Sequence, residues 1–198
     1  MGRIYSIGSS IHTIEEFVSL LNKYKIDAVA DVRSVPYSQH TPQYNKETLG
    51  RVLNGKHINY LDFSREFGAR RKEDDAYTNN KVDFKKVVKL PDFIYGIERI
   101  NAGILKGYTI ALLCTEKNPL DCHRFSLVSK ALVDTSGIIV DHILFDGELL
   151  NQHDLEKKML HDFGLENDLF NDYESQLECA YEKISTKVSW QELEGSDE

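Results

Sequence analysis

Residues 108–132, with the sequence YTIALLCTEKNPLDCHRFSLVSKAL, join an apolar strand pattern to a helical pattern across a short polar loop. The run from Tyr108 to Cys114 is the strongest predicted strand in the chain, because its residues are all apolar, aromatic or β-branched. After the loop, Asp121 is the predicted N-cap of a helix that carries Phe125, Val128 and Leu132 on its buried face. A strand followed by such a helix is the repeating unit of a parallel α/β sheet.

The same alternation of strands and helices extends outward along the chain. Further strands are predicted at residues 3–7, 28–32, 58–61 and 138–143, and helices at residues 46–53 and 91–107. Thr13 and Glu16 have the spacing of a capping box, which predicts that another helix starts there. We therefore predict a single Rossmann-like α/β domain with a mostly parallel sheet flanked by helices.

Two segments depart from this alternation. Residues 62–80 are rich in polar side chains and are predicted to form a long exposed loop. We assign residues 1–147 to the α/β domain and residues 148–198 to an acidic helical extension. The extension is predicted to contain helices near residues 153–163 and 168–185, followed by a frayed tail.

Composition and charge narrow the class of protein. The chain has 198 residues, of which 41% are hydrophobic and 28% charged, which suits one packed domain and excludes a disordered or fibrous class. The net charge of −8 is uneven, since residues 146–198 contain 15 acidic and 4 basic residues and residues 1–145 contain 17 and 20. This charge pattern predicts that residues 146–198 form a solvated acidic tail. The alternative is a regulatory tail that masks the basic body. The overall acidity argues against nonspecific duplex binding.

Localisation and redox state follow from what the sequence contains. No apolar run approaches the roughly 20 residues of a membrane span, and the first ten residues lack the apolar stretch of a secretion signal. We therefore expect a cytoplasmic protein with no membrane partner. Cys114, Cys122 and Cys179 are too few for a disulfide framework and are expected to remain thiols.

The loop after Cys114 carries most of the candidate chemistry. If Cys122 lies in the first turn of the predicted helix, the helix dipole and neighbouring cations favour its thiolate, which makes it a candidate nucleophile. Glu116 and His123 are candidate acid/base groups, and Arg124 with the helix amides is a candidate anion site. The alternative is that both cysteines are buried as small hydrophobic residues and that His123 packs or caps.

Two earlier strand ends supply further candidates, because ligands bind beyond the carboxyl ends of parallel strands. Asp31 and Arg33 lie two residues apart at the end of one strand, so that Asp31 could orient the Arg33 guanidinium toward an anion. An ion pair that closes the strand end is the alternative. The turn at Gly8 to Ser10 has one glycine where a dinucleotide fingerprint needs three, which argues against a nicotinamide cofactor or a P-loop.

Metal binding and nucleic-acid contacts are weaker hypotheses. The spacing from Cys114 to Cys122 fits no common finger or ribbon, and neighbouring Cys122 and His123 rarely both reach one metal, so we predict no stoichiometric zinc. We predict no other cofactor. The basic residues of segment 65–72 could contact phosphates, and Tyr37, His40 and Tyr44 could stack on a base.

Taken together, these motifs resemble the domain-of-unknown-function family 488 over roughly residues 3–147. The resemblance rests on Ser6 to Ser10, Asp31 to Arg33 with Pro36, Pro42 to Lys46, Gly68 with Arg70 and Arg71, and above all on Cys114, Glu116, Pro119 and Cys122 to Arg124. The sequence departs from the family at Ser9 and Ala69, where the family often has histidine and glycine. The resemblance implies a compact α/β domain in which the Cys-x-Glu and Cys-His-Arg elements share one site, and it implies no substrate.

The favoured hypothesis is an enzyme that acts on a phosphorylated, nucleotide or other anionic small molecule. Its candidate catalytic residues are Asp31, Cys114, Glu116, Cys122 and His123, and its candidate substrate-binding residues are Gly8, Ser10, Arg33, Tyr44, Asn45, Arg70, Arg71 and Arg124. The alternatives are a noncatalytic module that binds nucleic acid or nucleotide, and a structural or interaction domain with packed thiols.

Overall fold

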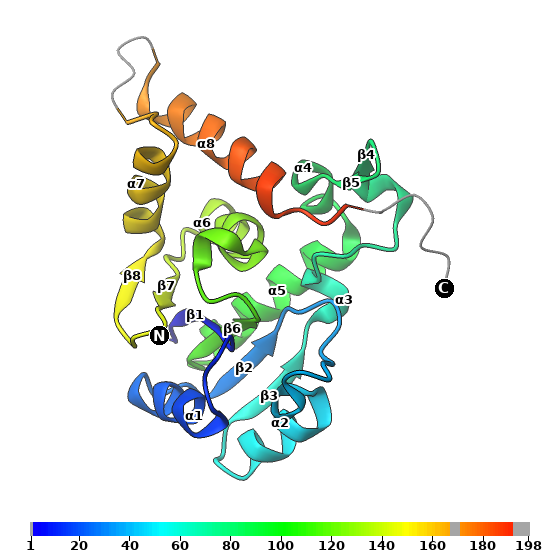
Figure 1. The fold of residues 1–198 in the computed structure, drawn as a ribbon, viewed down its shortest axis with the longest axis vertical. Coiled ribbons are helices and arrows are strands. Elements are labelled where there is room, and N and C mark those ends of the chain that lie inside the picture. The colour runs from blue at the N-terminus through cyan, green and yellow to red at the C-terminus, as the bar shows by residue number, and fades with distance from the viewer. Residues whose placement is uncertain (1, 167–170, 192–198) are drawn as a thin grey trace.

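The computed structural model of the chain, which describes residues 2–166 and 171–191, contains a six-stranded sheet in the order β3-β2-β6-β1-β7-β8 (Figure 1). The strands are β1 (Ile4–Gly8), β2 (Ala28–Asp31), β3 (Asn59–Asp62), β6 (Ile110–Cys114), β7 (Asp141–Ile143) and β8 (Leu149–Asn151). All neighbouring pairs are parallel except β7 and β8. The predicted α/β class with a mostly parallel sheet is confirmed.

Helices cover both faces of this sheet. Helices α1 (Ile14–Lys23) and α2 (Lys46–Asn54) lie on one face, and α5 (Pro91–Leu105) and α6 (Lys130–Ser136) lie on the other (Figure 1). Strand β6 is buried on both sides because Ala111 and Leu113 join the core under α1 and α2, while Ile110 and Leu112 join the core under α5. This double burial is why its sequence is continuously apolar.

The predicted capping box is present at the start of α1. The Glu16 backbone amide donates to the Thr13 hydroxyl at 3.2 Å, and the Thr13 amide donates to the Glu16 carboxylate at 2.8 Å. Two helical donors without intrahelical partners are thereby satisfied, which fixes where the chain turns after β1.

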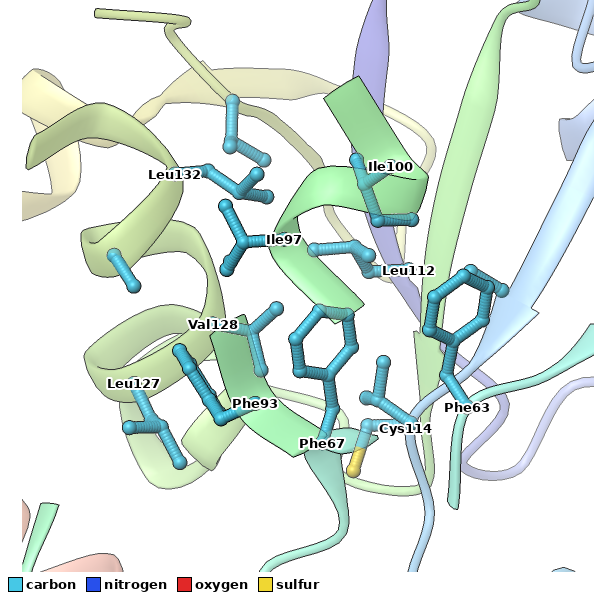
Figure 2. Packing of buried hydrophobic residues seen from close by; sticks show 14 of the residues in the cluster. Phe63, Phe67, Phe93, Ile97, Ile100, Leu112, Cys114, Leu127, Val128 and Leu132 are labelled. Carbon is cyan, nitrogen blue, oxygen red and sulfur yellow. The ribbon is translucent and has the colours of Figure 1, made fainter. Parts of the chain in front are cut away.

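The prediction of a long exposed loop at residues 62–80 is wrong. The segment contains α3 (Ser64–Phe67), a 3₁₀ turn (Asp74–Ala76) and β4 (Tyr77–Thr78), which pairs with β5 (Lys81–Val82) ahead of α4 (Phe84–Val87). Phe63 and Phe67 are buried and stacked at 5.3 Å, and Phe67 meets Phe93 of α5 edge-on at 5.2 Å (Figure 2). Two aromatic side chains four residues apart anchor the start of this segment in the core, although Arg65, Arg70, Lys72 and residues 78–80 remain exposed.

The predicted helix start at Asp121 is also wrong. Residues Pro119–Asp121 form a 3₁₀ turn capped by Asn118, whose side chain accepts the Leu120 amide at 3.2 Å, and Asp121 instead pairs with Lys187. Cys122 is extended, with φ −140° and ψ 141°. The helix begins with a widened π-helical turn at Arg124–Ser129 and continues as α6. Cys122 therefore does not lie in a first helical turn.

The C-terminal part packs against Leu120 and Phe125 and also forms backbone hydrogen bonds with β7 and β5. Strand β8 is an edge of the main sheet, and α7 (Gln152–Asp162) and α8 (Tyr173–Val188) follow it. Residues after α8 then return to β5, where the Val82 amide donates to the Trp190 carbonyl at 3.0 Å (Figure 1). The predicted helix start at Asp168 and most of the predicted frayed tail lie outside the described residues. No helix in the described ranges is long and apolar enough to cross a bilayer.

Candidate functional site

A cavity of about 490 Å³ lies beyond the carboxyl ends of β2 and β6. Four segments build it: the residues after β2, the residues from the end of β6 to His123, the loop after α3, and the end of α8 with the segment that follows. The lining residues are Arg33, Ser34, Val35, Ala69, Arg70, Cys114, Thr115, Glu116, Asp121, Cys122, His123, Val188, Ser189, Trp190 and Gln191. The cavity thus occupies the edge of a parallel sheet where ligands commonly bind.

Three buried side chains converge on the floor of this cavity, and we call them the thiol–imidazole cluster: Cys114, Cys122 and His123. The Nδ1 atom of His123 lies 3.8 Å from each Sγ, and the three atoms all lie within 4.8 Å of one another. The other ring nitrogen of His123 lies 3.0 Å from the Val32 carbonyl oxygen, which fixes the ring. Cys114 contributes to the cluster from the end of β6, beside Phe67 (Figure 2).

The two thiols of the cluster are electrostatically different. Burial opposes ionisation of Cys122, but a hydrogen bond from Cys114 and the charges of Arg124 and His123 outweigh it and hold the pKa of Cys122 well below its ordinary value. The same hydrogen bond and burial raise the pKa of Cys114. Burial alone would lower the pKa of His123, yet the neighbouring Cys122 thiolate raises it. Cys122 is therefore the more acidic thiol of the pair, and the Arg124 backbone amide at the start of the helix donates to its Sγ at 3.4 Å.

Glu116 adds a carboxyl group to the wall of the cavity. Burial, followed by the negative charge of Cys122, raises its pKa. The backbone of Glu116 is held in place from behind, since its carbonyl accepts a 2.7 Å hydrogen bond from Arg124. A Cβ atom at Gly8 would lie 2.1 Å from that carbonyl oxygen, so only glycine permits this approach at the end of β1.

Arg124 is a scaffold residue rather than part of the cavity wall. Its side chain is fully buried and donates to the carbonyl oxygens of Glu116 and Lys117 at 2.7 and 3.4 Å. Its Nε has no hydrogen-bond partner among the residues that the structure describes. The expected anion contact by Arg124 therefore has little geometric support, because the guanidinium faces the loop carbonyls.

Arg33 lines the cavity and is fixed by Asp31. Its Nε and one terminal nitrogen donate to the two carboxylate oxygens of Asp31 at 2.8 and 2.6 Å, and the same terminal nitrogen donates to the Tyr44 carbonyl at 2.8 Å. Asp31 is fully buried and also accepts the Tyr60 hydroxyl at 2.7 Å. Asp31 is therefore placed to orient Arg33, and it is not itself a wall residue.

Four further candidates stabilise the surrounding loops instead of lining the cavity. The Ser10 amide donates to the Thr115 carbonyl at 2.8 Å, and the Asn45 side chain accepts the Ser38 amide at 2.7 Å. The buried Tyr44 hydroxyl donates to the His12 carbonyl at 3.1 Å. Arg71 is buried, donates to the carbonyl oxygens of residues 65 and 66, and pairs with Glu73.

Sequence reasoning missed the wall formed by the segment after α8. The Trp190 ring lies edge-on to Tyr77, with centroids 6.2 Å apart, and the exposed Arg70 guanidinium lies 5.6 Å from the Trp190 ring centroid. Arg70 is further placed by the hydrogen bond from its amide to the Ser34 hydroxyl. One signal was available, since Trp190 is the sole tryptophan and stands in an otherwise polar tail.

Cys122 and His123 both reach the space beside Cys114, although such neighbours rarely reach one metal. Neighbouring residues were expected to point apart, but extended Cys122 and helical His123, with φ −62° and ψ −19°, direct both side chains toward Cys114. Three side chains of the two types that zinc accepts most often, cysteine and histidine, are therefore in one place.

Comparison with known proteins identifies one family. The profile described as "Domain of unknown function DUF488" matches residues 13–131, which include β2, β6 and the whole thiol–imidazole cluster. The chain matches no curated protein and no solved structure at a significant level. The match confirms the resemblance stated from the sequence over this range.

Proposed function

Because the chain belongs to the DUF488 family, whose description assigns no reaction, we propose a function from its site: an enzyme that acts on a small anionic molecule in this cavity. The reacting centre is the thiol–imidazole cluster together with Glu116. Arg70 and Arg33 hold the anionic group of the substrate. A phosphorylated molecule or a nucleotide suits these cations.

One observation carries this proposal: two thiol groups, an imidazole and a partly buried carboxyl group line the same cavity as two guanidinium groups. Perturbed titratable groups that meet in a cleft at the carboxyl edge of a sheet are typical of active sites. The raised pKa of Glu116 suits a general acid, because its proton is retained closer to neutral pH.

Anion binding is tested first, by calorimetric titration with inorganic phosphate and with a nucleoside monophosphate. We expect Arg70→Gln to weaken binding roughly 10-fold or more, since a hydrogen bond to a charged group contributes about 1.5–3 kcal/mol. Arg65→Gln is the matched control, because Arg65 is exposed and pairs with Asp92 away from the cavity. Equal binding by the wild type and Arg70→Gln would place the anion elsewhere.

Turnover is tested next, by incubating the protein with a panel of phosphorylated metabolites and nucleotides and identifying products by mass spectrometry. Glu116→Gln should lower turnover by about 100-fold or more, which is the usual contribution of a general acid or base. Glu15→Gln, on the exposed face of α1, should leave it unchanged. Equal turnover by the wild type and Glu116→Gln would contradict the assigned role.

The nucleic-acid alternative gains no support from the basic segment at residues 65–72. Arg65 forms an exposed ion pair with Asp92, and buried Arg71 is occupied by backbone carbonyls and Glu73. Arg70 lies against Trp190 at the cavity. The segment therefore offers fewer free cations than its sequence indicates, and a steep salt dependence of nucleic-acid binding is not expected.

A further inference from the structure

The thiol–imidazole cluster has the dimensions of a tetrahedral zinc site. With Zn–S bonds of about 2.3 Å and Zn–N bonds of about 2.0–2.1 Å, the edge between a sulfur and a nitrogen ligand is about 3.6 Å. Both Sγ atoms lie 3.8 Å from Nδ1 of His123, and the sulfur atoms lie within 4.8 Å of each other. A metal ion at the centre would therefore require only small side-chain movements.

The groups around the cluster are those that usually orient zinc ligands. If Nδ1 of His123 binds the metal, Nε2 carries the proton and donates to the Val32 carbonyl at 3.0 Å, as metal-bound imidazoles commonly do. The Arg124 backbone amide donates to Cys122 Sγ at 3.4 Å, which stabilises negative charge on that sulfur. All three ligands are at least nine-tenths buried, so their geometry is held by the fold.

Charge balance also favours a divalent ion at this place. Two thiolates and a neutral imidazole around one Zn²⁺ give a neutral centre, which lowers the cost of burying the thiolates. Sulfur and imidazole ligands select borderline and soft metals over magnesium or calcium. Since all three residues also line the cavity, a fourth coordination position would face the space where a substrate or water could enter.

We propose that Cys114, Cys122 and His123 bind one Zn²⁺ ion per chain, with the fourth coordination position open to the cavity. Three protein ligands and one open position are the arrangement of catalytic zinc sites rather than structural ones. The catalytic role of this ion rests on the proposed function, whereas the binding of the ion does not. Glu116 lines the same cavity and would supply the acid–base group.

The test is a titration of the full-length, reduced and metal-free protein with Co²⁺, followed by displacement with Zn²⁺. We expect thiolate-to-cobalt charge-transfer absorption that saturates at one equivalent. Cys179→Ser is the matched control, because Cys179 lies on α8 outside the cluster. Cys122→Ser should weaken Zn²⁺ binding by at least about 100-fold, because loss of a residue that only hydrogen-bonds to a metal ligand already costs about 10- to 100-fold in metal affinity. Absence of the thiolate band, or a band that is lost in Cys179→Ser and kept in Cys122→Ser, would overturn the proposal.

A second measurement needs no substitution and guards against a variant that fails to fold. Wild-type protein is alkylated with and without one equivalent of Zn²⁺, and each cysteine peptide is quantified by mass spectrometry. Zinc should slow alkylation of Cys114 and Cys122 at least 10-fold and leave Cys179 unchanged, whereas equal rates would overturn the proposal. Phosphate binding that depends on Arg70 in zinc-free protein would show that the proposed anion site stands while the zinc site has failed.

Discussion

The buried pair of Asp31 and Arg33 gives the sharpest prediction for stability. Asp31 accepts four hydrogen bonds: from the Arg33 amide, from two nitrogens of its guanidinium, and from the Tyr60 hydroxyl. Asp31→Ala removes all four acceptor contacts and leaves the Arg33 guanidinium with the Tyr44 carbonyl as its remaining acceptor among the described residues. Breaking a buried ion pair from one side costs about 3–5 kcal/mol, because the other charge stays buried without compensation.

We therefore expect Asp31→Ala to lower the free energy of unfolding by about 3–5 kcal/mol, measured by urea unfolding followed by far-UV circular dichroism. At about 2–4 °C per kcal/mol for a chain of this size, the melting temperature should fall by roughly 6–20 °C. The double variant Asp31→Leu with Arg33→Met should recover a large part of this loss, because neither charge is then left alone.

The exposed pair of Arg65 and Asp92 supplies the control, since the Arg65 side chain is 79% exposed. Asp92→Ala should cost less than about 1 kcal/mol, as exposed pairs usually do. If Asp31→Ala also costs less than about 1 kcal/mol, the buried-pair reasoning is refuted. If it abolishes turnover at unchanged stability, Asp31 takes part in the reaction itself.

Three further predictions concern other parts of the chain. Burial lowers the pKa of His142 to about 3, so that on acidification the unfolded state binds a proton before the folded state does. The free energy of unfolding should therefore fall by about 2 kcal/mol between pH 7 and pH 5. His142→Gln should remove this loss in unfolding curves recorded at both pH values. Gly8→Ala should lower the free energy of unfolding by about 1–3 kcal/mol through its clash with the Glu116 carbonyl, and equal thermal melting of the two proteins would contradict the close approach. Phosphate binding in the cavity should change the fluorescence of Trp190, and Arg70→Gln should remove that change, whereas a persistent change would place the anion away from Arg70.

Local patterns in the sequence predicted the layered architecture well. The apolar run before Cys114 and the capping box at Thr13 and Glu16 depend on neighbouring residues, so periodicity was sufficient to place β6 and α1. The failures involve long-range packing. Phe63 and Phe67 bury a polar segment against α5, and no local pattern records that contact.

The sequence predicted the reactive side chains of the candidate site, but it did not predict the wall of the cavity that Trp190 forms. Cys114, Glu116, Cys122 and His123 were chosen because they follow one strand closely, and all four line the cavity. Trp190 comes from the opposite end of the chain, so its approach depends on how α8 packs. The convergence of adjacent Cys122 and His123 depends on two backbone angles that residue type does not specify.

The widened turn at Arg124–Ser129 has a consequence for how this chain can tolerate change in length. A π-helical turn holds one residue more than the α-helical turn it replaces, and each α-helical residue advances the direction of the side chain by about 100°. If the same residues wound as a regular α-helix, the extra residue would rotate Cys122, His123 and Arg124 by about 100° relative to the face that α6 packs on the sheet. The irregular turn thus keeps the reactive residues and the packed face in phase, and deleting one residue within it should be tolerated better than deleting one residue within α6.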